Sequence, residues 1–177
     1  MGEPLRIVTL CTGNVARSVM LGYMLTDLAQ AARVHWLVRT AGTHVREDSA
    51  MSSRTRDALM GLSDLGDHHY GAHRSHQLSA LDVAWADLIV ATEAAHVHYV
   101  RRAFPEASPK AVQLHQFVRY APLDDDVAAQ AAAVSGLEPD ATYDVRDPAG
   151  GELADYERCV NELWELAQAF SVLVLPG

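Results

Sequence analysis

The sequence predicts an α/β fold in which one domain, residues 1–177, holds a doubly wound sheet of four parallel strands flanked by helices. Three observations lead to this prediction. Short apolar runs rich in β-branched residues alternate with longer segments whose apolar residues recur at helical spacing. Capping residues, glycine or proline mark the changes between the two patterns. Strands that alternate with helices form a parallel sheet with right-handed crossovers, which gives a flavodoxin-like arrangement of three layers.

The apolar runs are the predicted strands. The first, residues 5–10, is apolar throughout, as expected for a central strand that is covered on both faces. The other predicted strands are residues 35–40, 87–92 and 111–114. The predicted helices are residues 16–32, 52–62, 93–104 and 152–169. Residues 122–139 are rich in Ala and Asp and predict a surface insertion whose helicity the pattern leaves open.

Composition limits the classes of function. The chain is 49% hydrophobic and 21% charged, which are ordinary values for a globular protein. Its formal net charge of −9 argues against nucleic acid and anionic membranes as partners, because both require basic surfaces. The first ten residues do not have the pattern of a signal peptide, and the two cysteines are far apart in sequence. We therefore expect a cytoplasmic location.

The segment Cys11–Ser18, with the sequence C-T-G-N-V-A-R-S, joins the first predicted strand to the first predicted helix. Backbone N–H groups at such a helix N-terminus bind anions. Arg17 adds a planar set of donors, and Ser18 can donate its hydroxyl to a sulfur atom. The same environment favours the thiolate of Cys11, which is the nucleophilic form. The residues expected to hold an oxyanion by their amides are Thr12, Gly13, Asn14, Val15, Ala16 and Arg17.

This loop resembles that of the low-molecular-weight protein tyrosine phosphatases, in which it also follows the first strand. Other segments resemble the family in the family's order along nearly the whole chain. They are Thr40-Ala41-Gly42-Thr43, residues 73–78, residues 87–90 and Tyr143-Asp144-Val145-Arg146-Asp147-Pro148.

The resemblance implies a cysteine-dependent phosphatase that forms a phosphocysteine intermediate and needs no cofactor or metal. It implies that Asp147 is the general acid and then the general base, and that Thr40 and His73 support the loop around Asn14. It also implies that phosphate, sulfate or vanadate can occupy the loop. By itself an Asp-Pro pair more often marks a turn, so the role of Asp147 depends on the resemblance.

Alternatives remain for the substrate. Tyrosine-specific members carry an aromatic residue after the Asp-Pro pair, where this chain has Ala149, and none stands in residues 44–51. Relatives that act on phosphoarginine tend to carry threonine where Val15 stands, and valine favours an apolar leaving group. The main prediction is protein phosphotyrosine; the alternatives are phosphoarginine, a small phosphate ester, or a phosphoprotein-binding module with little turnover.

A metal site is the remaining alternative. His68, His69, His73 and His76 lie close together in sequence, but their spacing does not match a closed zinc site. Cys159 falls on the apolar side of the last predicted helix and is expected in the core.

Overall fold

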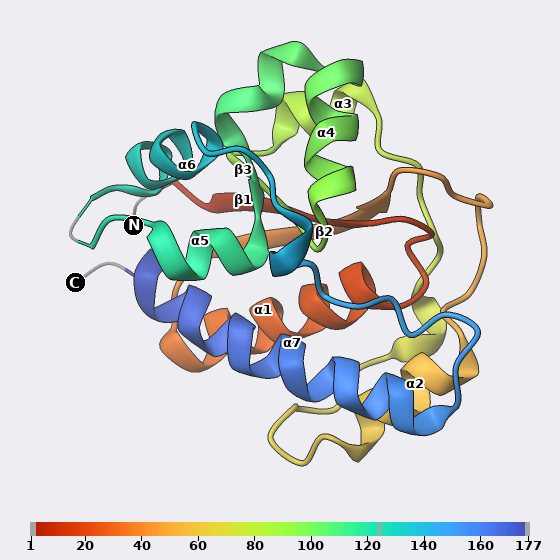
Figure 1. Cartoon of the computed structure of the whole chain (residues 1–177). Helices are drawn as coiled ribbons and strands as arrows, with labels where there is room; N and C mark the ends of the chain where they lie inside the picture. Colours follow the sequence, from red (N-terminus) through yellow and green to blue (C-terminus); the bar gives the residue numbers. More distant parts are fainter. Residues whose placement is uncertain (1–2, 124, 176–177) are drawn as a thin grey trace.

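The computed structural model describes residues 3–123 and 125–175. Its centre is a sheet of four parallel strands in the order β2-β1-β3-β4 (Figure 1). The strands are β1 (Leu5–Cys11), β2 (Trp36–Gly42), β3 (Leu88–Ala91) and β4 (Ala111–Gln113). The predicted parallel sheet is confirmed, with strand ends that differ by one or two residues.

Helices connect the strands and follow the last one. They are α1 (Arg17–Ala32), α2 (Ser53–Gly61), α3 (Ala80–Trp85), α4 (Ala94–Ala103), α5 (Leu114–Tyr120), α6 (Val127–Ser135) and α7 (Leu153–Val174). Short 3₁₀ turns lie at Tyr70–Ala72, Pro105–Lys110 and Ala141–Tyr143. Within residues 3–123 and 125–175, no helix combines the length and the apolar character that crossing a membrane requires.

Two helices were not predicted. Helix α3 has only six residues, which is too few to show a helical repeat of apolar residues in the sequence. A capping box between Ser79 and Asp82 stabilises its start. Helix α5 follows β4 directly and has no side-chain cap, so nothing in the sequence marks its start. The segment 122–139, whose helicity the sequence left open, contains helix α6, with Asp126 as its N-cap. Helix α7 extends beyond the predicted end because Phe170 and Val174 continue its buried side.

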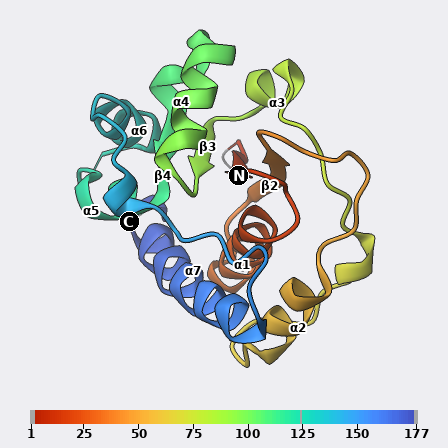
Figure 2. The same ribbon diagram turned by 45° about the vertical axis from the view of Figure 1, so that its right-hand side comes forward.

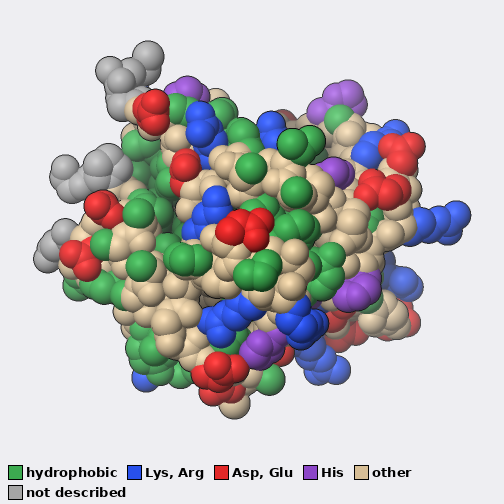
Figure 3. All heavy atoms as spheres, turned by 90° about the horizontal axis from the view of Figure 1, so that it is seen from above, with side chains coloured by type: hydrophobic (Ala, Val, Ile, Leu, Met, Phe, Trp, Pro, Cys, Tyr) green, Lys and Arg blue, Asp and Glu red, His purple; other side chains and the backbone are tan. Residues whose placement is uncertain are grey.

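Helices cover both faces of the sheet (Figures 1 and 2). Consecutive strand residues point to opposite faces, so Ile7 packs in one hydrophobic cluster and Val8 in the other. The first cluster includes residues of α1, α2, α5, α6 and α7. The second includes residues of α3 and α4. Seen from above, acidic and basic side chains are interspersed over this surface, with no continuous basic area (Figure 3).

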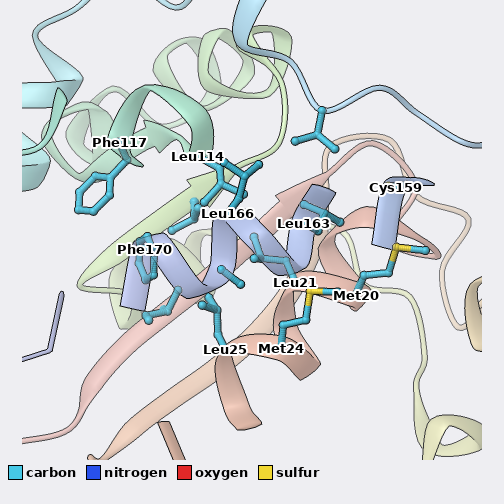
Figure 4. Close-up of a cluster of buried hydrophobic side chains, with 14 of the residues drawn as sticks. Met20, Leu21, Met24, Leu25, Leu114, Phe117, Cys159, Leu163, Leu166 and Phe170 are labelled. Carbon is cyan, nitrogen blue, oxygen red and sulfur yellow. The ribbon is translucent and has the colours of Figure 1, made fainter. Parts of the chain in front are cut away.

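The larger cluster is formed mainly where α7 lies against α1 and α5 (Figure 4). Phe170 of α7 packs against Phe117 of α5, with ring centroids 5.2 Å apart. Met20 and Met24 of α1 are fully buried beneath α7. This packing fixes α1 against the sheet, and α1 begins with the arginine of the Cys11–Ser18 loop.

The carboxyl ends of β1 and β2 meet at one edge, where Cys11 is paired in register with Gly42. In sheets of this kind, ligands bind beyond these ends. The amides of Thr43 and His44 donate to the carbonyls of Cys11 and Thr12, at 3.0 and 2.9 Å. Gly42 is packed so closely that an added Cβ would lie 2.5 Å from the Thr12 carbonyl oxygen.

The substitution Gly42→Ala is expected to destabilise the protein by about 1–3 kcal/mol, because the new methyl overlaps backbone that has no room to move. Urea unfolding measures the change. Gly61→Ala is the matched control: nothing lies within 4 Å of its added Cβ at the end of α2, and removing a helical glycine stabilises by about 0.5–1 kcal/mol. Equal stability of the two variants would contradict the close approach at Gly42.

Candidate active site

The sulfur of Cys11 lies at the end of β1, where the loop to α1 curls around it. Its side chain is nearly fully buried. The Ser18 hydroxyl is 3.0 Å from Sγ, and the Asn14 amide points at Sγ from 3.3 Å. The hydrogen bond expected between Ser18 and the sulfur is therefore present. Both donors favour negative charge on the sulfur.

Asn14 shapes the loop. Its backbone takes the left-handed conformation, with φ of 54°, and its side chain is fully buried. Its Nδ2 donates to Ser18 Oγ and Thr40 Oγ1, each at 2.9 Å, and its Oδ1 accepts from the His76 amide at 2.9 Å. His73 Nε2 contacts the Asn14 carbonyl oxygen at 2.8 Å. Thr40 and His73 thus both bind Asn14.

Gly13, next to Asn14, does not make this turn. Gly13 is not among the residues with positive φ, and an added Cβ would meet only Val15 Cγ2, at 3.7 Å. The loop reverses through Asn14 instead, because the asparagine side chain fixes a left-handed backbone by its own hydrogen bonds.

His73 acts on the loop as a neutral donor. Burial lowers its pKa, and the charge of Arg74 lowers it further, against the opposing effect of the bond to Asn14. A carbonyl oxygen only accepts hydrogen bonds, so the proton of the neutral ring is on Nε2. In this tautomer His73 donates to the Asn14 carbonyl.

Arg17 carries a buried positive charge, with a residue exposure of 1%. Its Nη1 donates to Glu93 Oε1 and, at 2.9 Å, to the Val145 carbonyl; its Nη2 donates to Asp147 Oδ2 at 3.0 Å. Burial disfavours the charge, but Asp147 and Glu93 outweigh it and raise the pKa of the guanidinium. Within the described residues, Nε–H and one Nη2–H have no acceptor. Two donors therefore remain for an anion.

Asp147 lies in a segment, residues 143–151, that we call the acid loop. Its Oδ2 binds Arg17, and its Oδ1 accepts from the Ala149 amide at 3.0 Å. The carboxylate is 42% exposed, so substrate and water can reach it. The structure thus brings Cys11, Arg17 and Asp147 together at one edge of the sheet.

The beginning of the acid loop is fastened to the sheet. The Val145 amide donates to the Thr92 carbonyl at 2.9 Å. Asp144 Oδ1 accepts from the Ala94 amide at 2.7 Å and from Gln113 Nε2 at 2.8 Å. Behind the second half of the loop, a cavity of about 260 Å³ separates Asp147 from Cys159 and Glu162 of α7.

Two residues of this site were missed by sequence reasoning. Glu93 pairs with Arg17, and His96 is buried beside Thr12, with Nε2 2.9 Å from Thr12 Oγ1. Both lie at the start of α4, where they form a capping box. Glu93 could have been found from its position, because it follows the third strand at the edge of the sheet where ligands bind.

His96 is held in its neutral form. Burial, with smaller contributions from the charges of Arg17 and His44, lowers its pKa to about 3. Its Nδ1 accepts from the Glu93 amide at 3.1 Å. A neutral ring that accepts through Nδ1 carries its proton on Nε2.

The second cysteine is buried, and His68 and His76 have acidic partners. Cys159 is buried as expected, and burial raises its pKa to about 12. His68 contacts Asp27 at 2.6 Å, and His76 contacts Asp82 at 2.7 Å. Over the described part of the chain, no group of three or more His, Cys, Asp or Glu residues is arranged to hold a metal ion.

Fold and site together define a class: an α/β protein with a cysteine at the end of its first strand, beneath a loop that leads to a helix N-terminus. Residues 6–130 match the family described as low molecular weight phosphotyrosine protein phosphatase. The chain is 32% identical over 160 residues to a protein-arginine-phosphatase of Geobacillus stearothermophilus, covering 90% of this chain and 89% of that one.

Solved structures agree. The YwlE arginine phosphatase of Geobacillus stearothermophilus matches 96% of this chain and 92% of its own, with a TM-score of 0.73 and 30% identity. A low molecular weight protein tyrosine phosphatase from T. tengcongensis matches 93% and 96%, with a TM-score of 0.75 and 26% identity. The chain belongs to the low molecular weight phosphotyrosine protein phosphatase family, as its loop predicted, and it is a phosphoric monoester hydrolase.

Acidification is expected to destabilise the protein through His96. An unfolded histidine binds a proton below its ordinary pKa of about 6.5, whereas folded His96 stays neutral down to about pH 3. Between these values the unfolded state binds more protons than the folded state. The free energy of unfolding therefore decreases as the pH is lowered, by up to about 1.4 kcal/mol per pH unit.

Urea unfolding of the wild type and His96→Gln between about pH 4 and pH 7 measures this dependence. The variant should lose stability less steeply on acidification. His98→Gln, on the exposed side of α4, serves as the control and should follow the wild type. The same slope in all three proteins would contradict a neutral buried His96.

Proposed function

We propose that this phosphatase dephosphorylates protein phosphotyrosine through a phosphocysteine intermediate. One observation carries the proposal: the Cys11 sulfur lies under a loop curled by Asn14, with the free donors of Arg17 and the carboxylate of Asp147 at the same edge. This arrangement offers a nucleophile, an anion cradle and a proton donor in one place.

In the first step the Cys11 thiolate attacks phosphorus, and the bond from phosphorus to the ester oxygen breaks. Asp147 gives its proton to the leaving oxygen, which departs as an alcohol or phenol. The loop amides, together with the Nε–H and Nη2–H donors of Arg17, hold the three equatorial oxygens.

In the second step water attacks the phosphocysteine. The Asp147 carboxylate takes a proton from this water, the bond between phosphorus and sulfur breaks, and phosphate is released. The Ser18 hydroxyl, 3.0 Å from Sγ, stabilises the thiolate as it leaves. Phosphate, sulfate and vanadate are expected to bind in the same cradle.

An apolar leaving group suits the loop mouth. Val15 is partly exposed there and presents methyl groups. His44, whose amide binds the Thr12 carbonyl, packs edge-on against Tyr99 with ring centroids 5.6 Å apart. Tyr99 of α4 thus packs against a residue bonded to the loop, whereas residues 44–51 contain no Phe, Tyr or Trp.

Turnover of para-nitrophenyl phosphate tests the residue roles. Cys11→Ser should abolish it, because a hydroxyl is not ionised as a thiol is. Asp147→Asn should lower kcat by roughly 10²–10⁴-fold, the usual value of a general acid. Steady-state kinetics, with vanadate as competitor and without added metal, measures both effects.

The matched control for this experiment is Cys159→Ala, which removes a thiol that burial keeps protonated, and it should stay active. An active Cys11→Ser protein would overturn the mechanism. A wild type that binds phosphopeptide without turnover would instead favour a phosphoprotein-binding module.

Phosphoarginine is the second candidate substrate, because a protein-arginine-phosphatase is 32% identical to this chain. Val15 favours the phenyl leaving group over the polar guanidinium. A panel of phosphotyrosine and phosphoarginine peptides should therefore give the higher kcat/KM for phosphotyrosine, and Val15→Thr should lower this ratio by roughly tenfold, as one polar contact can. If the wild type prefers phosphoarginine peptides, phosphoarginine becomes the first candidate substrate and phosphotyrosine the second.

The cytoplasm is the proposed place of action. Cys11 and Cys159 are both free, and the mechanism needs a reduced Cys11, which a reducing compartment maintains.

A further inference from the structure

The hydroxyl of Thr12, the residue that follows the nucleophile, has its hydrogen-bond partner outside the loop. Its partner is His96 of α4, 84 positions further along the chain. His96 is 2% exposed, and both of its ring nitrogens have polar contacts. A buried histidine with each nitrogen engaged has a fixed ring orientation.

The direction of the bond follows from the other side of the ring. Nδ1 faces the Glu93 amide at 3.1 Å, and an amide N–H only donates. The Thr92 hydroxyl, 3.4 Å from Nδ1, donates its proton to the Leu10 carbonyl at 3.2 Å, so the Glu93 amide is the donor to Nδ1. Nδ1 is therefore an acceptor, so the proton of the neutral ring is on Nε2 and points to Thr12 Oγ1.

Thr12 Oγ1 consequently accepts from His96 and keeps its own proton for another partner. Among the described residues, this hydroxyl has no contact besides His96. Thr12 follows Cys11 directly and is partly exposed, so solvent and ligands can reach this residue. A hydroxyl that already accepts one bond is polarised and becomes a better donor.

We propose that the Thr12 hydroxyl donates a hydrogen bond to a phosphoryl oxygen of the substrate, and that His96 is the positioning residue that aims it. The proposal rests on the proposed function, because it adds a side-chain donor to the amides of the same loop. The neutral state of His96 above about pH 3 keeps its Nε2 proton directed at Thr12.

Phosphate binding measures the donor without any turnover. The probe is inorganic phosphate, titrated calorimetrically into the Cys11→Ser protein with and without Thr12→Val. Loss of a hydrogen bond to a charged oxygen should weaken binding roughly tenfold or more. Thr12→Ser keeps the hydroxyl and should bind phosphate nearly as well as the parent.

Two further variants distinguish positioning by His96 from a purely structural role: a double variant tests whether His96 and Thr12 act together, and the substitution His96→Gln tests whether binding is restored. His96→Leu should weaken phosphate binding about as much as Thr12→Val, and the double variant should be no weaker than either one. His96→Gln should restore part of the affinity, because its amide both donates and accepts. His98→Leu is the matched control on the same helix and should bind normally. In active protein, the change should be seen in KM more than in kcat.

Several results would overturn the proposal. Unchanged phosphate affinity in Thr12→Val would remove the donor, and additive effects in the double variant would reduce His96 to a packing residue. If His96→Leu fails to fold, the comparison of Thr12→Val with Thr12→Ser still decides about the donor and His96→Gln about its positioning. A wild type without turnover whose Cys11→Ser form shows the Thr12-dependent affinity would refute the catalytic mechanism and leave this donor standing.

Discussion

The site depends on one buried asparagine. Asn14 places a left-handed residue between Cys11 and α1, and the hydrogen bonds of its side chain hold it there. An unpaired amide group at this depth would cost about 1–3 kcal/mol. Its partners come from three segments, the loop itself, β2 and the chain around His76, so the loop curls only when the sheet edge has formed.

The second constraint is the charge of Arg17. A guanidinium without partners in this position would be expelled by the cost of desolvation. Glu93 and Asp147 offset that cost and at the same time fix the planar group before any ligand arrives. The entropy of ordering this side chain is therefore lost on folding and not on binding, which is the essence of a preorganised anion site.

The sequence predicts features that depend on neighbouring residues and misses those that depend on contacts between residues far apart in the chain. The four strands and the loop around Cys11 are local patterns, and both were predictable. The Asp147 carboxylate was identified only through a family motif, since an Asp-Pro pair alone marks a turn. Glu93 and His96 had no local signal: their roles arise because α4 begins beside the loop in space. The position of the turn had no unique local signal either, because Gly13 and Asn14 both tolerate a left-handed backbone and the side-chain bonds of Asn14 decide where the chain turns.

The acid loop is fastened unevenly. Asp144 and Val145 are bonded to the strand ends, whereas residues 147–151 border the cavity in front of α7 and hold themselves mainly by short-range bonds and the Arg17 pair. Only a few residues are thus able to swing, and a stretch this short rearranges in nanoseconds to microseconds, not in the milliseconds of a hinged domain. Rearrangement of this short stretch therefore adds no slow gate before the bonds to phosphorus are made and broken.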